Sequence, residues 1–152
     1  MANKFFPVSI DLNDKNILVI GAGKISLRKI ETLLKYNCNI TVITKEVLEE
    51  KFFDLEKDDK IKILKYQEFE EKFLEKIFLV IAATDDEVLN KNISQLCMSK
   101  NILVNNITSK DDMNVRFASI YEKDDIQIAI SANGNPKKAV EIKHKIKDIF
   151  EK

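Results

Sequence analysis

Residues Asn16–Ser26 read NILVIGAGKIS, and this stretch decides the fold of the chain. Its apolar run, from Ile17 to Ile20, is typical of a buried strand, and a helical pattern follows over residues 24–35. The chain has only three glycines, and two of them, Gly21 and Gly23, stand between the strand and the helix. A sharp strand-to-helix turn built on glycine predicts a βαβ unit that binds a dinucleotide.

The two glycines have different expected roles. Gly21 permits the tight turn, and Gly23 lacks the side chain that would block a pyrophosphate. The free N–H groups and the positive dipole end of the following helix then face the anion. Ser26 stands where a third glycine is usual, and its small side chain still permits close packing of the helix on the strand.

Strand and helix patterns alternate along the chain as far as Asn106. The expected strands cover residues 16–20, 40–44, 61–66, 77–82 and 102–105, and the expected helices cover residues 24–35, 47–56, 70–74 and 86–99. Val8–Leu12 is expected to form a short leading strand or an edge segment. This order predicts the α/β class, with a Rossmann-like, doubly wound parallel sheet.

The pattern changes in the last third of the chain. Two strands are expected over residues 114–120 and 126–131, with a charged turn at residues 122–125, and a closing helix begins near Pro136. Such a segment is too small to hold its own core. We therefore expect a dinucleotide-binding domain over residues 1–113 and a smaller segment over residues 114–152, which packs on the first domain or on a second chain.

Composition narrows the class of protein. Lys plus Arg and Asp plus Glu number 25 each, so the zero net charge favours neither nucleic acid nor an anionic membrane as a partner. No apolar run approaches the roughly eighteen residues of a membrane span, and the first residues lack the apolar core of a signal peptide. Cys38 and Cys97 are expected to be buried, reduced thiols. These features predict a soluble cytoplasmic protein.

The end of the second expected strand bears on the choice between NAD and NADP. Thr44-Lys45-Glu46 stands where an acidic ribose ligand is usual, so Thr44 is a candidate for a ribose hydroxyl and Glu46 comes two residues late. Lys45 would favour the 2′-phosphate of NADP, although a solvated lysine is the commoner case. The residues alone leave both cofactors open.

A second group of candidate cofactor-binding residues follows the fourth expected strand. Ala82 and Ala83 are small and leave room beside the point where the strand order of such sheets reverses. Thr84 offers a hydroxyl to the cofactor, and Asp85 or Asp86 is expected to cap the next helix.

Together these segments resemble the precorrin-2 dehydrogenase / sirohydrochlorin ferrochelatase family of sirohaem synthesis. The resemblance runs almost without gaps from Phe6 to Ser131. Its most specific parts are the Arg28-Lys29 pair and the run AATDD from Ala82 to Asp86. The other matching segments are Phe6-Pro7-Val8, Leu33-Leu34, Thr41-Val42, Asn90, Leu103–Asn105, Phe117–Ile120 and Ile128–Ser131.

The resemblance implies an NAD-dependent oxidation of precorrin-2 to sirohydrochlorin, which many family members follow with insertion of ferrous iron. It implies cofactor contacts at Lys24 and Ile25, and at Lys45 and Glu46. It also implies a homodimer in which the segment from Asn114 onward faces the partner. NAD is therefore the expected cofactor, precorrin-2 the expected substrate, and ferrous iron a candidate second substrate.

Three features depart from the family: the residue at position 108, the loop Asn133-Gly134-Asn135-Pro136, which has asparagine before the proline, and the end of the sequence at Lys152. Thr108 stands where the resemblance places the catalytic aspartate, and a threonine is no general base near neutral pH without an activator. Asp111 and Asp112 are candidates to replace it from the same loop, although a solvated loop position is commoner for such residues. No cluster has metal-ligand spacing, and the single histidine, His144, stands among lysines.

Two hypotheses follow. The first is an NAD-dependent precorrin-2 dehydrogenase, with ferrochelatase activity as an open addition. The second is a non-catalytic relative that binds a nucleotide or a tetrapyrrole and acts in regulation or delivery. Thr108 and the end of the sequence at Lys152, where many members continue, favour the second hypothesis, whereas the preserved glycine turn favours the first. We expect the dehydrogenase.

Overall fold

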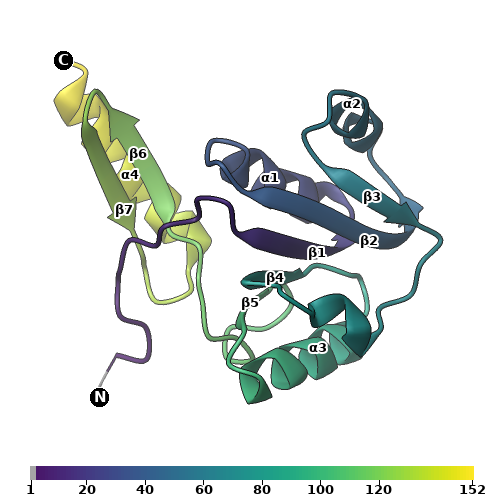
Figure 1. The fold of residues 1–152 in the computed structure, drawn as a ribbon. Coiled ribbons are helices and arrows are strands. Elements are labelled where there is room, and N and C mark those ends of the chain that lie inside the picture. Colours follow the sequence, from purple (N-terminus) through teal and green to yellow (C-terminus); the bar gives the residue numbers. More distant parts are fainter. Residues whose placement is uncertain (1–2) are drawn as a thin grey trace. The chain divides into compact units, whose positions relative to one another are not determined.

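The computed structural model describes residues 3–152 and divides into two compact units, residues up to Val115 and Arg116–Lys152. In the larger unit, five parallel strands form one sheet in the order β3-β2-β1-β4-β5 (Figure 1). The predicted α/β class with a Rossmann-like parallel sheet is confirmed. The strands are β1 (Asn16–Ala22), β2 (Asn39–Val47), β3 (Lys62–Lys65), β4 (Leu79–Ala82) and β5 (Leu103–Asn106).

Helices alternate with these strands. They are α1 (Lys24–Leu33), α2 (Lys51–Lys57), the 3₁₀ helix η1 (Glu71–Leu74) and α3 (Glu87–Ser99). One core cluster joins Leu18 of β1 and Val80 of β4 to Leu74 of η1 and to Ile93 and Cys97 of α3. Apolar contacts with η1 and α3 therefore cover one face of the sheet.

The other face of the sheet is buried as well. Ile17 and Val19 alternate with Leu18 along β1, so their side chains point to the opposite face, and both are fully buried. Helix α1 runs beside β1 and β2 (Figure 1) and contributes the buried side chains of Ile30 and Leu33. Burial on both faces explains why these strands are continuous apolar runs in the sequence.

The strand order reverses between β1 and β4. These two strands are hydrogen-bonded neighbours, with Ile20 opposite Ala82 at their carboxyl ends. The chain leaves β1 toward α1 and leaves β4 toward α3. In open α/β sheets a ligand binds in the crevice outside the strand ends at such a reversal.

Strand β2 is longer than predicted and contains an irregularity near its carboxyl end. Between the last regular pair and the pair Ala22–Val47, β1 advances two residues while β2 advances four. The N–H of Leu48 then donates to the carbonyl of Ala22 at 3.1 Å. Because pairing continues through Val47, the helix predicted to begin at that residue begins only at Lys51.

The smaller unit, Arg116–Lys152, is a two-stranded antiparallel sheet and one helix. Its elements are β6 (Ser119–Lys123), β7 (Ile126–Ile130) and α4 (Pro136–Phe150). The Asn135 side chain accepts the N–H of Lys138 at 3.1 Å and so caps α4, with Pro136 at the first helical position.

The largest differences from the predicted strands lie at residues 8–12 and 114–120. Residues 8–12 form no strand, because their backbone pairs with no neighbouring strand. The strand predicted to begin at Asn114 begins at Ser119, and the predicted turn residues Glu122 and Lys123 belong to β6. Asn114 is instead tied to the end strand of the sheet, since its Oδ1 accepts the N–H of Val104 at 2.7 Å.

Candidate functional site

A cleft of about 840 Å³ opens in the larger unit beside the carboxyl ends of β1, β2 and β4. Its volume is in the range of ordinary ligand sites. All nine residues predicted to bind the cofactor line it, namely Gly21, Gly23, Lys24, Ile25, Thr44, Lys45, Glu46, Ala83 and Thr84. Thr108 also lines the cleft, whereas Asp111 and Asp112 do not. Cofactor contacts and catalytic roles for these residues stay predictions.

The two glycines of the turn differ in what surrounds them. Gly21 has a φ of +106°, and a Cβ there would lie 2.3 Å from the carbonyl oxygen of Ala83. At Gly23 the nearest atom to an added Cβ would be Leu48 Cδ1, at 3.9 Å. Gly21 therefore allows β1 to approach the end of β4 closely, and Gly23 leaves an open space in the cleft wall that fits a bulky anion.

The N-terminus of α1 faces this space without a side-chain cap. Gly23 is the N-cap residue, and no acidic residue stands in the first turn. The buried hydroxyl of Ser26 donates to the carbonyl of Gly21 at 2.7 Å and so fastens the helix to the turn. Uncapped N–H groups and the helix dipole favour a phosphate at this place.

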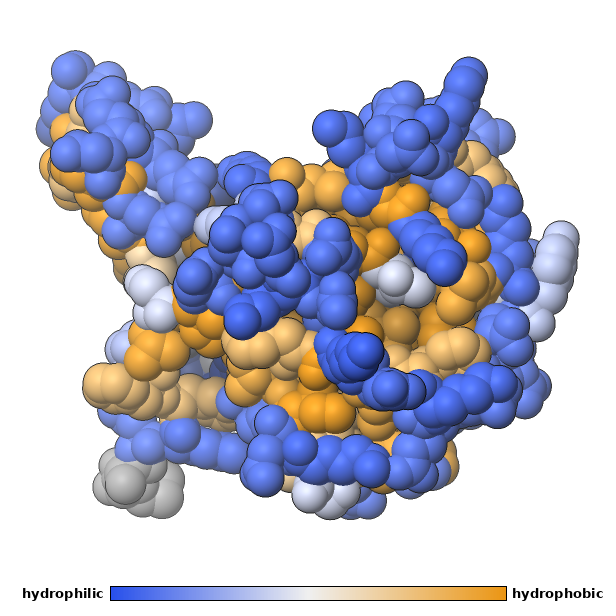
Figure 2. Space-filling model, in the orientation of Figure 1, coloured by the Kyte–Doolittle hydropathy of each residue, from blue (hydrophilic) through white to orange (hydrophobic). Residues whose placement is uncertain are grey.

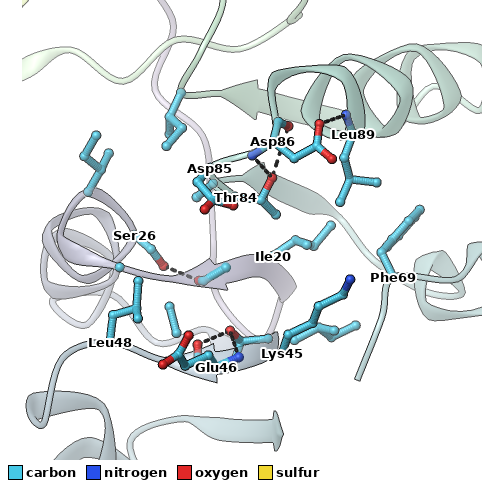
Figure 3. A pocket seen from close by; sticks show the side chains of 18 of the residues that line it. Ile20, Ser26, Lys45, Glu46, Leu48, Phe69, Thr84, Asp85, Asp86 and Leu89 are labelled. Atoms are coloured by element: carbon cyan, nitrogen blue, oxygen red, sulfur yellow. Dashed lines mark hydrogen bonds between the residues drawn. The ribbon is translucent and has the colours of Figure 1, made fainter. Parts of the chain in front are cut away.

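The β2 side of the cleft is built by Thr44 and by Lys45 and Glu46, the last two of which are labelled in Figure 3. The Thr44 hydroxyl donates to the carbonyl of Glu46 and accepts the N–H of Glu46 at 3.2 Å, so it holds the irregular part of β2 together. Its donor is thus used within the protein. The Glu46 carboxylate is exposed and lines the cleft.

Lys45 is paired across the cleft wall. Its Nζ lies 2.9 Å from Oε1 of Glu68. This hydrogen bond and the opposite charge raise the pKa of Lys45 and lower the pKa of Glu68. The pair is solvent-exposed, so it contributes little to stability, but Glu68 compensates the charge of Lys45 at this edge of the cleft.

On the other side of the cleft, Asn90 of α3 joins the segments that follow β4 and β5. Its Oδ1 accepts the N–H of Thr84 at 3.1 Å and the Thr84 hydroxyl at 2.6 Å. Its Nδ2 donates to the carbonyl of Thr84 at 3.0 Å and to Oγ1 of Thr108 at 3.1 Å. The sequence reasoning gave Asn90 no role, although a polar residue between the apolar Leu89 and Ile93 was a usable signal.

Thr108 is held from a second direction. Its hydroxyl and its N–H both donate to Oδ1 of Asn106, each at 2.9 Å. Nδ2 of Asn106 is buried and has no hydrogen-bond partner among residues 3–152. The neighbouring loop is self-contained, because the Ser109 hydroxyl donates to Asp112 Oδ2 at 3.1 Å and accepts the Asp112 N–H at 3.0 Å.

Apolar side chains complete the cleft. Ile25 and Leu48 line it and are exposed to solvent. Figure 2 shows exposed apolar surface, coloured orange, on this unit, with hydrophilic side chains around it. An apolar lining with a few convergent polar groups suits the flat rings of a nucleotide.

Other kinds of site find little support in the described part of the chain. Within residues 3–152, no group of three or more His, Cys, Asp or Glu side chains is placed to hold a metal ion. None of the helices in that range combines the length and the apolar character needed to cross a bilayer.

Comparison with known proteins agrees with this geometry. Residues 8–119 match the family described as "Putative NAD(P)-binding". The chain is 38% identical over 130 residues to a sirohaem synthase of Mannheimia succiniciproducens and 40% identical over 130 residues to one of Buchnera aphidicola. Each match covers 86% of the chain. The resemblance inferred from sequence is confirmed.

These matches leave much of the relatives uncovered. The chain spans 27% of the length of each of these sirohaem synthases. Among solved structures, it is similar to SirC, a precorrin-2 dehydrogenase, with a TM-score of 0.81 and 25% sequence identity. That likeness covers 95% of the chain and 70% of SirC.

Proposed function

Because the chain belongs to this NAD(P)-binding family, we propose that it is an NAD-dependent precorrin-2 dehydrogenase that forms sirohydrochlorin for sirohaem synthesis. The observation that carries the proposal is the open space at Gly23, under the uncapped N-terminus of α1, in a chain similar to sirohaem synthases. A dinucleotide pyrophosphate fits such a place.

In this proposal, different parts of the cleft bind different parts of the cofactor. The turn from Gly21 to Ser26 takes the pyrophosphate, and the β2 side takes the adenosine ribose. Ile25 and Leu48 offer apolar surface to the adenine. When bound, NAD supplies the oxidant, because it accepts one hydride per turnover.

Selection of NAD over NADP rests on Glu46. Glu46 comes two positions later in the sequence than the usual acidic ribose ligand. The irregularity of β2 contains two extra residues, and Glu46 therefore lies at the rim of the cleft. A carboxylate there accepts ribose hydroxyls and repels a 2′-phosphate. Lys45 does not offset this repulsion, because Glu68 compensates its charge. Glu46→Ala should therefore narrow the difference between the dissociation constants of NAD and NADP, as calorimetry would show.

Assembly and location belong to the same proposal. We propose a homodimer formed through Arg116–Lys152, whose helix α4 leaves Val140, Ile142 and Ile149 exposed. The protein is proposed to work in the cytoplasm. Light scattering at micromolar concentration tests the assembly, and a monomer of 17.5 kDa would contradict it.

The direct test is incubation with enzymatically prepared precorrin-2 and NAD. Sirohydrochlorin absorbance and NADH absorbance should rise together in equal amounts. Parallel samples with NADP should react more slowly, and samples given ferrous iron afterwards test iron insertion as a second activity. Tight binding of NAD without any turnover of precorrin-2 would contradict the proposed dehydrogenase.

A second candidate is a non-catalytic relative that binds a nucleotide or a tetrapyrrole. The observation that favours it is Thr108, whose hydroxyl is fully engaged by Asn90 and Asn106. If no other carboxylate of the cleft serves as the base, Thr108→Asp should raise kcat, since general-base assistance is worth about a hundred- to ten-thousandfold. If neither the wild type nor this variant oxidises precorrin-2, yet the wild type binds tetrapyrrole, the second candidate is preferred.

A further inference from the structure

The carboxylates of the cleft are not equivalent. Five acidic side chains line it among the described residues, namely Glu46, Glu49, Glu68, Asp85 and Asp86. Glu68 is paired with Lys45 at 2.9 Å. Asp86 caps α3, since its Oδ1 accepts the N–H of Leu89 at 3.0 Å. These two carboxylates already have structural partners.

The remaining three carboxylates lie in different halves of the cleft. Glu46 and Glu49 belong to the end of β2 and the segment after it. Asp85 follows β4, on the other side of the strand reversal (Figure 3). A dinucleotide crosses the crevice at such a reversal, with its adenosine ribose near the second strand. The nicotinamide half, which would take the hydride, would then lie on the side of Asp85.

The Asp85 carboxylate makes no hydrogen bond among residues 3–152, and it is exposed to solvent. It feels the charge of Lys45, whose direct ion-pair partner is Glu68. Its neighbour Thr84 is fixed by Asn90, which also holds Thr108. The backbone on either side of Asp85 is thus positioned by Thr84 and by the Asp86 cap, while the carboxylate itself is uncommitted.

The alternatives for a proton acceptor are weaker. The Thr108 hydroxyl donates to Asn106 and accepts from Asn90, so it is already engaged both as donor and as acceptor. It does not act as a proton acceptor at neutral pH. Asp112 is bound to Ser109, and neither Asp111 nor Asp112 lines the cleft. Asp85 is therefore the uncommitted carboxylate in the half of the cleft where the substrate is oxidised.

We propose that Asp85 is the general base of this site and accepts the proton that precorrin-2 loses during oxidation. The inference rests on the proposed dehydrogenase function. The substrate loses one hydrogen as hydride, with both electrons of its bond, to the nicotinamide. The second hydrogen leaves as a proton to Asp85 Oδ, and the electrons of its bond remain in the macrocycle as a new double bond. Water then removes the proton from the exposed carboxylate.

The experiment compares two neighbouring charge removals. Asp85→Asn should lower kcat about a hundredfold or more, with the dissociation constant of NAD and the KM of precorrin-2 changed by less than about threefold. Glu87→Gln is the matched control, because Glu87 is an exposed residue of the first turn of α3 that does not line the cleft, and its kcat should stay within about twofold of wild type. Thermal unfolding of both variants checks that the fold is retained.

A further measurement separates a catalytic from a structural role. Added formate should restore part of the rate of Asp85→Ala, because it supplies a carboxylate to the vacated space. Recovery by formate would support the proposal, and no recovery over a series of formate concentrations would overturn it.

The possible failures are distinguishable. If wild type oxidises precorrin-2 and Asp85→Asn matches its kcat, Asp85 is not the base, while the dehydrogenase function stands. If Asp85→Asn loses NAD affinity and keeps its kcat, Asp85 is a binding residue and the proposal is overturned. If wild type binds NAD but never oxidises precorrin-2, the function and the inference both fail.

Discussion

The two units of this protein bury their apolar residues to different extents. Within residues 3–152, all but two of the apolar side chains that are almost fully buried belong to the larger unit, and the exceptions are Tyr121 and Ala139. The parallel sheet is covered on both faces, whereas the side chains of β6 and β7 are exposed or half-buried, apart from the buried Tyr121. A sheet with two covered faces supplies its own core, and a two-stranded sheet with one helix does not. In the proposed homodimer, a second chain covers the apolar surface that the smaller unit leaves exposed.

The largest expected effect is a loss of stability in the larger unit, which supplies its own core. Gly21→Ala places a Cβ 2.3 Å from the carbonyl oxygen of Ala83, at a φ of +106°. Strain and overpacking together should cost more than about 3 kcal/mol of the free energy of unfolding. Urea denaturation followed by circular dichroism measures this loss. The control is Gly23→Ala, which meets open space and should lose at most about 1 kcal/mol; equal stability of the two variants would contradict the packing at Gly21.

The next effect is a loss of NAD affinity without a loss of stability, and it is expected from a substitution in the same turn. Gly23→Val adds side-chain atoms where the pyrophosphate is expected, while its φ of −104° suits any residue. We expect the affinity for NAD to fall at least a hundredfold, or about 2.7 kcal/mol, with little change in the unfolding midpoint. Calorimetric titration of NAD into both proteins checks this, and an unchanged affinity would remove the cofactor from this turn.

A third prediction concerns the smaller unit. Ile149 of α4 is 66% exposed, and Val88 of α3 in the larger unit is 69% exposed. In a symmetric dimer each interface residue is buried twice, so Ile149→Gln should weaken dimerisation more than tenfold. Val88→Gln should leave the dimer intact. Sedimentation across a concentration series distinguishes the two variants, and equal behaviour would place the dimer interface away from Ile149.

The smallest effect concerns a charge partly buried in the larger unit. Burial and, to a smaller extent, the nearby charge of Arg28 lower the pKa of Lys29 to about 8. Between about pH 8 and pH 10.5 the unfolded chain then binds more protons at this residue than the folded chain does, so this residue makes the free energy of unfolding rise with pH.

Lys29→Met should remove that contribution. We expect the variant to be more stable than wild type by about 1 kcal/mol at pH 7, a value discounted for partial exposure of the side chain. This difference should shrink as the pH approaches 10.5. Chemical denaturation at several pH values measures it, and parallel stability curves for the two proteins would show that Lys29 keeps its ordinary pKa.

Local patterns were enough to predict the parallel sheet. The runs that became β1 and β4 are continuous because both faces are buried, and Gly21 and Gly23 are rare enough in this chain to mark the turn. The nine predicted cofactor residues line one cleft for the same reason, since parallel strands bring their carboxyl ends to one edge.

The remaining features depend on contacts between distant residues. Val47 continues β2 because it pairs with Ala22, and no local pattern reveals that register. Asn114 leaves the predicted strand because Val104 engages its side chain. The Thr108 hydroxyl is fixed by Asn90, eighteen residues away, so its chemistry was not readable from its own loop. Strand propensity at Val8–Leu12 was likewise insufficient without a neighbouring strand.

The interrupted pairing of β1 and β2 also affects the cost of binding. Ala22 pairs with Val47 beyond the irregularity, and its carbonyl accepts the N–H of Leu48. The glycine turn is thus held between two hydrogen-bonded segments and is ordered before any ligand arrives. An incoming dinucleotide therefore loses little free energy to the ordering of the backbone. We therefore expect the amide hydrogen of Leu48, although its side chain is exposed, to exchange with solvent as slowly as the amides of the sheet.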